Sequence, residues 1–108
     1  MNFDEAFTPR AKDDVSGQVL WFSKRSQELA WTFLEAVRTT FEKIIDQPDG
    51  GMFWDDDDSA GQSQSIRYRI VDGFPNHLMI YSPRPDGVRI LRVFHSARRI
   101  TKSMILDD

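Results

Sequence analysis

The sequence contains no cysteine and only two histidines, His77 and His95. The lack of cysteine excludes disulfide bonds, thiolate zinc sites and cysteine nucleophiles. Two imidazoles are too few for a metal site built from several histidines, and no apolar run approaches the roughly 18 residues of a membrane span. The N-terminal residues carry an early acidic pair, Asp4 and Glu5, and lack the apolar core of a signal peptide. We therefore expect a cytoplasmic protein without metal or other cofactor.

The length of 108 residues is that of one domain, because a second domain with its own core would need at least about 50 residues. The composition is 40% hydrophobic and 12% aromatic, which is typical of a globular rather than a disordered chain. We expect residues 1–108 to form a single domain.

Charge is divided unevenly along the chain. Residues 1–65 have a net charge of −7 and residues 66–108 one of +4. The acidic total argues against binding of nucleic acid by the chain alone, whereas an arginine-rich second part favours an acidic or phosphate-bearing partner. Guanidinium groups pair with carboxylates and phosphates through two hydrogen bonds. The alternative is that a solvent-facing sheet surface simply uses arginine. The arginines concerned are Arg67, Arg69, Arg84, Arg89, Arg92, Arg98 and Arg99.

Two segments have helical periodicity. The first covers residues 9–24, with Thr8 as N-cap and Pro9 at the first helical position. The second begins after the cap Ser26 and stops before Pro48. Because only one or two residues separate them, the two helices must form an antiparallel hairpin. Its second helix has an apolar stripe made of Ala30, Phe33, Leu34, Val37, Phe41, Ile44 and Ile45.

The remaining segments predict strands and one long loop. Residues 3–7 alternate weakly and predict an N-terminal edge strand, whereas residues 48–65 have many breakers and predict an irregular loop. Period-two alternation then predicts three strands, over residues 65–71, 76–82 and 88–95. Their short connections make them an antiparallel meander.

The last of these strands, VRILRVFH, is largely apolar on both faces, which is typical of a central strand covered on both sides. The helical hairpin can cover one side, so the C-terminal segment or a partner chain must cover the other. The fold class predicted is α+β, with an N-terminal edge strand and an antiparallel helical hairpin packed on a small antiparallel sheet.

This order of elements resembles the ParE branch of the ParE/RelE superfamily, which are toxins of bacterial type II toxin–antitoxin systems. The last strand of that branch typically reads isoleucine-leucine-arginine-valine-leucine-histidine-glycine-alanine-arginine-aspartate, and this chain reads ILRVFHSARR from Ile90 to Arg99. Upstream, FTPRAKDD resembles the family's entry to its first helix. SIRYRIVDGFPNHLMIYSPRPDGV resembles its middle hairpin, with Arg67 at the usual arginine and Phe74 and Tyr81 at the aromatic positions.

The resemblance implies a toxin of the kind found in plasmid stabilisation systems, neutralised by a ParD-like antitoxin encoded beside it. The characterised target of the ParE branch is DNA gyrase, and no bond chemistry is attributed to the toxin, so we expect a gyrase inhibitor and not an enzyme. Both a homodimer and a toxin–antitoxin hetero-oligomer fit this expectation. The residues expected to bind target or antitoxin are Arg67, Arg69, Arg92, His95, Arg98 and Arg99.

An alternative is a ribosome-dependent endoribonuclease, which is the activity of the RelE branch. Such an enzyme needs a base, an acid and cations around one phosphate. The residues that could supply them are His95, Arg67, Arg98 and Tyr81. Against this, Tyr81 in mid-strand is typical of a core aromatic, His95 at a strand end is typical of a structural histidine, and the basic-and-tyrosine C-terminal signature of that branch is absent after Arg99.

A third hypothesis is a degenerate member that binds an antitoxin but poisons nothing. It is kept open by two departures from the branch, Ser96 in place of glycine and Arg99 in place of aspartate.

The acidic run from Asp55 to Asp58 predicts a solvated loop and not a cation site, because consecutive carboxylates point apart. Phe53 and Trp54 beside it either tuck under the core or act as interface anchors. Trp21 and Trp31 are expected in or beside the seam of the hairpin, with partial exposure as the alternative for Trp31.

Overall fold

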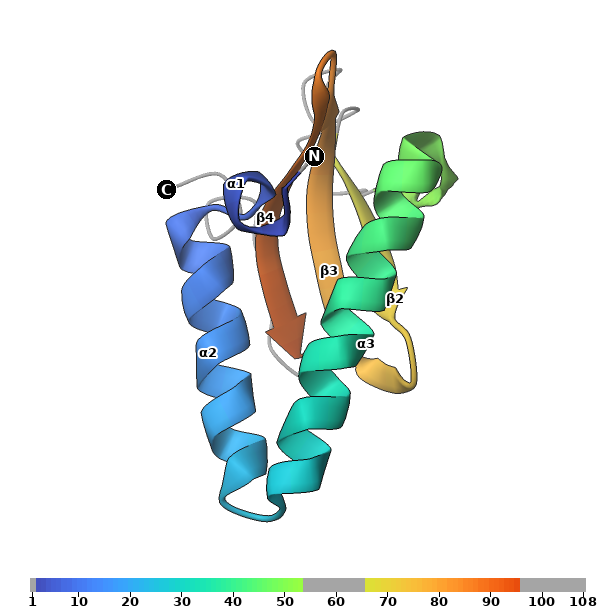
Figure 1. The fold of residues 1–108 in the computed structure, drawn as a ribbon. Coiled ribbons are helices and arrows are strands. Elements are labelled where there is room, and N and C mark those ends of the chain that lie inside the picture. The colour runs from blue at the N-terminus through green and yellow to red at the C-terminus, as the bar shows by residue number, and fades with distance from the viewer. Residues whose placement is uncertain (1, 54–65, 96–108) are drawn as a thin grey trace.

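Two long helices lie on one side of an antiparallel sheet in the computed structural model, which describes residues 2–53 and 66–95 (Figure 1). The helices are α1 (Phe3–Ala6), α2 (Pro9–Ser23), α3 (Gln27–Asp46) and the 3₁₀ turn η1 (Pro48–Gly50). The strands are β1 (Met52–Phe53), β2 (Arg67–Val71), β3 (Phe74–Arg84) and β4 (Gly87–His95). The predicted α+β class is therefore confirmed. None of the helices in the described ranges is long and apolar enough to cross a membrane.

The predicted helical hairpin is confirmed, with its ends within a residue or so of the expected positions. The Thr8 hydroxyl caps α2 by accepting a hydrogen bond from the backbone N–H of Ala11 at 3.0 Å. Ser26 caps α3 in the same way through the N–H of Leu29 at 3.2 Å. Each cap satisfies a helix N–H that has no partner inside the helix, which is why the two helices begin at these residues.

The sheet contains the predicted meander and one further strand. Among the described residues its order is β1-β2-β3-β4, and each neighbouring pair is antiparallel. The meander of β2, β3 and β4 is as expected. The segment predicted to be irregular, residues 48–65, instead begins with η1 and with β1, which pairs Met52 and Phe53 with β2. A strand of two residues is too short for its periodicity to be recognised in the sequence.

The N-terminal segment is a helical turn and not the predicted edge strand. The side chain of Asn2 caps this turn, α1, and only Phe7 pairs with the sheet, in a single parallel bridge to Ile90. Phe3 and Phe7 are four residues apart, a spacing that brings side chains together on a helical turn. Their rings stack with 4.2 Å between centroids. The alternation in the sequence was therefore read with the wrong period.

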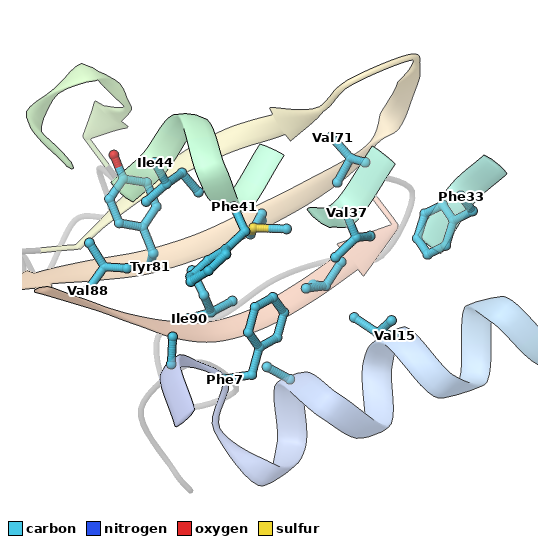
Figure 2. Packing of buried hydrophobic residues seen from close by; sticks show 14 of the residues in the cluster. Phe7, Val15, Phe33, Val37, Phe41, Ile44, Val71, Tyr81, Val88 and Ile90 are labelled. Atoms are coloured by element: carbon cyan, nitrogen blue, oxygen red, sulfur yellow. The ribbon is translucent and has the colours of Figure 1, made fainter. Parts of the chain in front are cut away.

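The main core lies between the two long helices and the sheet (Figure 2). Phe7, which follows α1, and Val15 of α2 belong to this core, and α3 contributes a stripe of apolar side chains along its length. The sheet residues that meet these side chains are Val71, Met79, Tyr81, Val88, Ile90 and Val93. On the opposite side of the sheet, a second cluster contains Ile66, Ile80, Leu91 and Phe94 with Tyr68 beside it.

The prediction that the last strand is central is wrong for the described residues, because β4 lies at the end of the sheet. Its outer edge is nevertheless occupied by the chain itself. The backbone N–H of Thr8 donates to the carbonyl of Ile90, and the Thr8 hydroxyl donates to the carbonyl of Leu91, both at 3.0 Å. The apolar pattern on both faces of β4 reflects the main core on one side and the second cluster on the other. The C-terminal segment, expected to provide cover, lies outside the described residues.

Candidate functional site

The arginines of the described strands do not form one surface, which corrects the alternative that a solvent-facing side of the sheet carries them. Arg67 and Arg69 are the cross-strand partners of Tyr81 and Met79, both fully buried in the main core. Residues directly opposite each other in a sheet share a face. These two arginines therefore lie on the helix-facing side of β2, while the guanidinium of Arg92 is turned toward α2.

Arg67 fastens the segment that follows α3 to the sheet. Its Nη1 donates hydrogen bonds to the backbone carbonyls of Gly51, at 2.8 Å, and of Asp49, at 3.1 Å. The guanidinium also lies over the ring of Phe53, with Cζ 4.1 Å from the centroid. These contacts hold η1 and β1 against β2, so the structure gives Arg67 a structural role in addition to its predicted one in binding.

Tyr81 anchors the same segment from inside the core. The side chain is fully buried, its hydroxyl donates to the carbonyl of Pro48 at 2.7 Å, and it accepts from the N–H of Gly51 at 3.0 Å (Figure 2). Burial raises the pKa of Tyr81, and this effect is opposed by the Gly51 hydrogen bond and the charges of Arg67 and Arg69. The core position weighed from the sequence is thus confirmed.

Arg92 forms a buried ion pair with Asp14 of α2. Its Nε lies 2.7 Å from Oδ2 and its Nη2 lies 2.9 Å from Oδ1 of the carboxylate. The same Oδ2 accepts the backbone N–H of Val93 at 2.9 Å. Both side chains are largely buried, so the pair locks α2 to β4. Sequence reasoning missed this pair because its two members are 78 residues apart.

His95, one of the predicted site residues, lies at the end of β4 opposite His77 of β3, and the two imidazole centroids are 5.0 Å apart. His77 is 5% exposed, and its Nε2 lies 2.7 Å from Oε1 of Gln18 on α2. Burial, and secondarily the charge of His95, lower the pKa of His77. Sequence reasoning did not single out His77, although its inward position could be read from the alternation with Met79 and Tyr81.

A pocket of about 460 Å³ opens beside the two histidines. Among the described residues its lining consists of Gln18, Trp21, Phe22, Gly73, Phe74, Pro75, Asn76, His77 and His95. The lining is rich in aromatic side chains and also includes the amide side chains of Gln18 and Asn76. Residues 2–53 and 66–95 contain no group of three or more His, Cys, Asp or Glu that could hold a metal ion.

The residues named for RNA cleavage do not converge in the described ranges. His95 pairs with His77, and Tyr81 lies four residues further along β3, a separation of about 13 Å at the usual rise per residue of a strand. Arg67 stands beside Tyr81 at the far end from His95. Arg98, like Arg99, lies outside the described residues. A base, an acid and a cation drawn from the described residues of this set would not reach one phosphate together.

The sequence left open whether Phe53, Trp54 and Trp31 are buried, and those of them that the structure describes are exposed. Phe53 is 55% exposed, while Trp54 and the acidic run from Asp55 to Asp58 lie outside the described ranges. Trp21 and Trp31 are 46% and 59% exposed. Neither tryptophan is therefore buried in the seam of the hairpin, and the partial exposure weighed for Trp31 is confirmed.

Comparison with known proteins identifies the family. Residues 6–100 match the model of the family described as ParE toxin of type II toxin-antitoxin system, parDE. A search of the curated proteins found no significant match. The matched range includes both long helices, the meander and the buried pair Asp14–Arg92. The chain therefore belongs to the ParE toxin family of type II toxin–antitoxin systems.

Proposed function

We propose that this ParE-family toxin arrests growth by binding and inhibiting DNA gyrase, without bond chemistry of its own. Membership in the family makes the chain the toxin of a type II pair and implies an antitoxin partner. The finer assignment to gyrase is supported by the resemblance of the last strand and its continuation, from Ile90 to Arg99, to the ParE branch.

The observation that carries the non-catalytic part of the proposal is the enclosure of Tyr81. Its hydroxyl is buried and engaged by Pro48 and Gly51, so a substrate would have to displace the η1–β1 segment to reach it. Arg67 is engaged in the same segment, and Arg92 is neutralised by Asp14. Cleavage without a metal would need an accessible acid, base and cation around one phosphate. Their absence from a common site in the described residues favours inhibition by contact.

The test is an ATP-dependent supercoiling assay with purified toxin and purified gyrase. We expect toxin to block supercoiling, and expression without antitoxin to arrest growth and induce the DNA-damage response. Normal supercoiling at saturating toxin would refute the gyrase assignment. Cuts at the ribosomal A site in primer extension would support the endoribonuclease in its place. A chain that binds antitoxin without arresting growth would be the degenerate member.

Arginine variants can locate the contact surface. We expect Arg98→Ala and Arg99→Ala each to weaken gyrase inhibition by about tenfold, which is typical of losing one charge-assisted hydrogen bond across an interface. Arg84→Ala is the matched control, because Arg84 is exposed at the end of β3 and does not belong to the predicted binding set. Equal effects of all three variants would show that charge alone, and not a defined contact, is responsible.

Tyr81→Phe separates contact from catalysis. The variant removes the hydroxyl while keeping the buried ring. We expect it to retain gyrase inhibition when activity is normalised to folded protein, measured by circular dichroism. Loss of toxicity in a folded Tyr81→Phe protein would instead indicate a chemical role for the hydroxyl.

A further inference from the structure

The two histidines of the chain face each other at one end of the sheet. His77 and His95 are directly opposite in the register of β3 and β4, and their rings lie 5.0 Å apart at an interplanar angle of 82°. Side chains directly opposite each other in an antiparallel pair are close enough to act on one ligand. We propose that His77 and His95 together bind a single transition-metal dication that prefers imidazole, with Zn²⁺ as the reference ion.

The contact with Gln18 prepares His77 for this role. Oε1 of an amide can only accept a hydrogen bond, so the Nε2 that lies 2.7 Å from it carries the hydrogen. The lone pair of the ring then resides on Nδ1. Metal-bound histidines almost always donate their other ring N–H to such an acceptor, which fixes both the tautomer and the orientation of the ring. Gln18 would thus be a positioning residue for the metal.

Nδ1 of His77 is the second observation that points to a ligand. It is buried, yet it has no hydrogen-bond partner within residues 2–53 and 66–95. A buried polar atom without a partner is costly and uncommon in native proteins.

The surroundings of the pair suit such an ion. His95 is exposed at the end of β4, where its imidazole faces the ring of His77. The pocket of about 460 Å³ is lined by both imidazoles. Its described lining contains no carboxylate, which disfavours Ca²⁺ and Mg²⁺ relative to ions that prefer nitrogen. The sequence excluded a site of several histidines, whereas the register reveals a pair.

The experiment is calorimetric titration of untagged, full-length protein with ZnCl₂, and with CaCl₂ as a comparison. We expect one Zn²⁺ per chain with a Kd on the order of 1–100 μM, because two protein ligands bind more weakly than the four of a structural site. His95→Phe should weaken Zn²⁺ binding by at least about tenfold. Gln18→Leu should weaken it by about tenfold, as is usual for the partner of a metal-bound imidazole.

CaCl₂ distinguishes the pair from the acidic run of Asp55 to Asp58, since Ca²⁺ binds oxygen and not imidazole. Any Ca²⁺ binding should be unchanged in His95→Phe. The proposal is refuted by absence of saturable Zn²⁺ binding up to about 1 mM, a concentration well above the expected Kd. It is equally refuted if the folded His95→Phe variant binds Zn²⁺ as tightly as the wild type does.

A spectroscopic readout avoids dependence on a variant at buried His77. The ring nitrogens of ¹⁵N-labelled wild-type protein can be followed by NMR during the Zn²⁺ titration. We expect the Nδ1 signal of His77 to move while its Nε2 remains protonated toward Gln18. A titration in which only carboxylate-rich segments respond would contradict the proposal. Because the readout is metal binding, its failure leaves the gyrase assignment untouched.

Discussion

The guanidinium of Arg92 on β4 and the carboxylate of Asp14 on α2 form a two-point, hydrogen-bonded ion pair with N–O distances of 2.7 and 2.9 Å. The same carboxylate accepts the N–H of Val93. Together with Thr8, which bonds the carbonyls of Ile90 and Leu91, Asp14 satisfies backbone groups that an edge strand would otherwise present to another chain. Addition of a partner's strand along this part of β4 is therefore disfavoured.

The first prediction concerns this ion pair. Asp14→Ala should lower the free energy of unfolding by about 3 kcal/mol, because it leaves the buried Arg92 without its counter-charge. Asp14→Asn should cost less, since it keeps an acceptor for the N–H of Val93. Urea unfolding measures both. Asp13→Ala is the control, with an exposed neighbouring carboxylate and an expected change within about 0.5 kcal/mol. Equal losses at positions 13 and 14 would contradict the role of the pair.

The second prediction tests the close approach of Gly51 to β2 and β3. A Cβ at this position would overlap the Tyr81 hydroxyl and lie 2.9 Å from the backbone carbonyl oxygen of Tyr68. Gly51→Ala should therefore destabilise the fold by about 1–3 kcal/mol, measured by urea unfolding. Gly50→Ala is the matched control, because its nearest neighbours are side-chain atoms of Gln47 at 3.4 Å or more. A Gly51 variant as stable as the Gly50 variant would show that the segment moves without cost.

The third prediction is a gain in stability. Gly17 lies on the exposed face of α2, and a Cβ built there meets nothing within 4 Å among the described residues beyond its chain neighbours and the backbone of its own helix. Gly17→Ala should raise the free energy of unfolding by about 0.5–1 kcal/mol, because alanine restricts the unfolded chain and favours the helix. Thermal unfolding would show a higher midpoint. Gly73→Ala should act in the opposite direction, since Gly73 has a φ of +78° that alanine adopts only with strain.

The parts of the fold that the sequence predicted are those determined by neighbouring residues. Thr8 and Ser26 each cap a helix three residues ahead, and the stripe of α3 repeats within a few turns, so both features are visible in a short window. The meander is visible for the same reason. The segment before Thr8 was misread because five residues, FDEAF, satisfy alternation and a helical turn equally well. Contact of its phenylalanines with Phe41 decides between them.

The parts that failed depend on distant residues. The position of β4 in the sheet could not be derived from its own composition. A strand at the end of a sheet that is covered on both faces has the same apolar pattern as a central strand. The directions of Arg67 and Arg92 depend on Gly51 and Asp14, which the sequence does not connect to them. The candidate site was therefore predicted as a list of residues without their geometry. Its binding role stays a prediction.

The last prediction is a dependence of stability on alkaline pH. Burial raises the pKa of Tyr81 in the folded protein above its ordinary value of 10.0, which the unfolded chain retains. Above pH 10 the unfolded state therefore loses its tyrosine proton while the folded state keeps it, and stability falls as pH rises, by up to about 1.4 kcal/mol per pH unit from this group. The stabilising contribution is fully present below pH 10.

Tyr81→Phe provides the comparison, because phenylalanine does not titrate. The variant should lose about 1–2 kcal/mol at neutral pH, since the carbonyl of Pro48 and the N–H of Gly51 lose their partner. The difference in unfolding free energy between wild type and variant should shrink over the range above pH 10. Urea unfolding at closely spaced pH values measures that difference, in which contributions common to wild type and variant cancel. A constant difference across this range would mean that the folded protein ionises Tyr81 as readily as the unfolded chain, and that its hydroxyl is not held as the structure indicates.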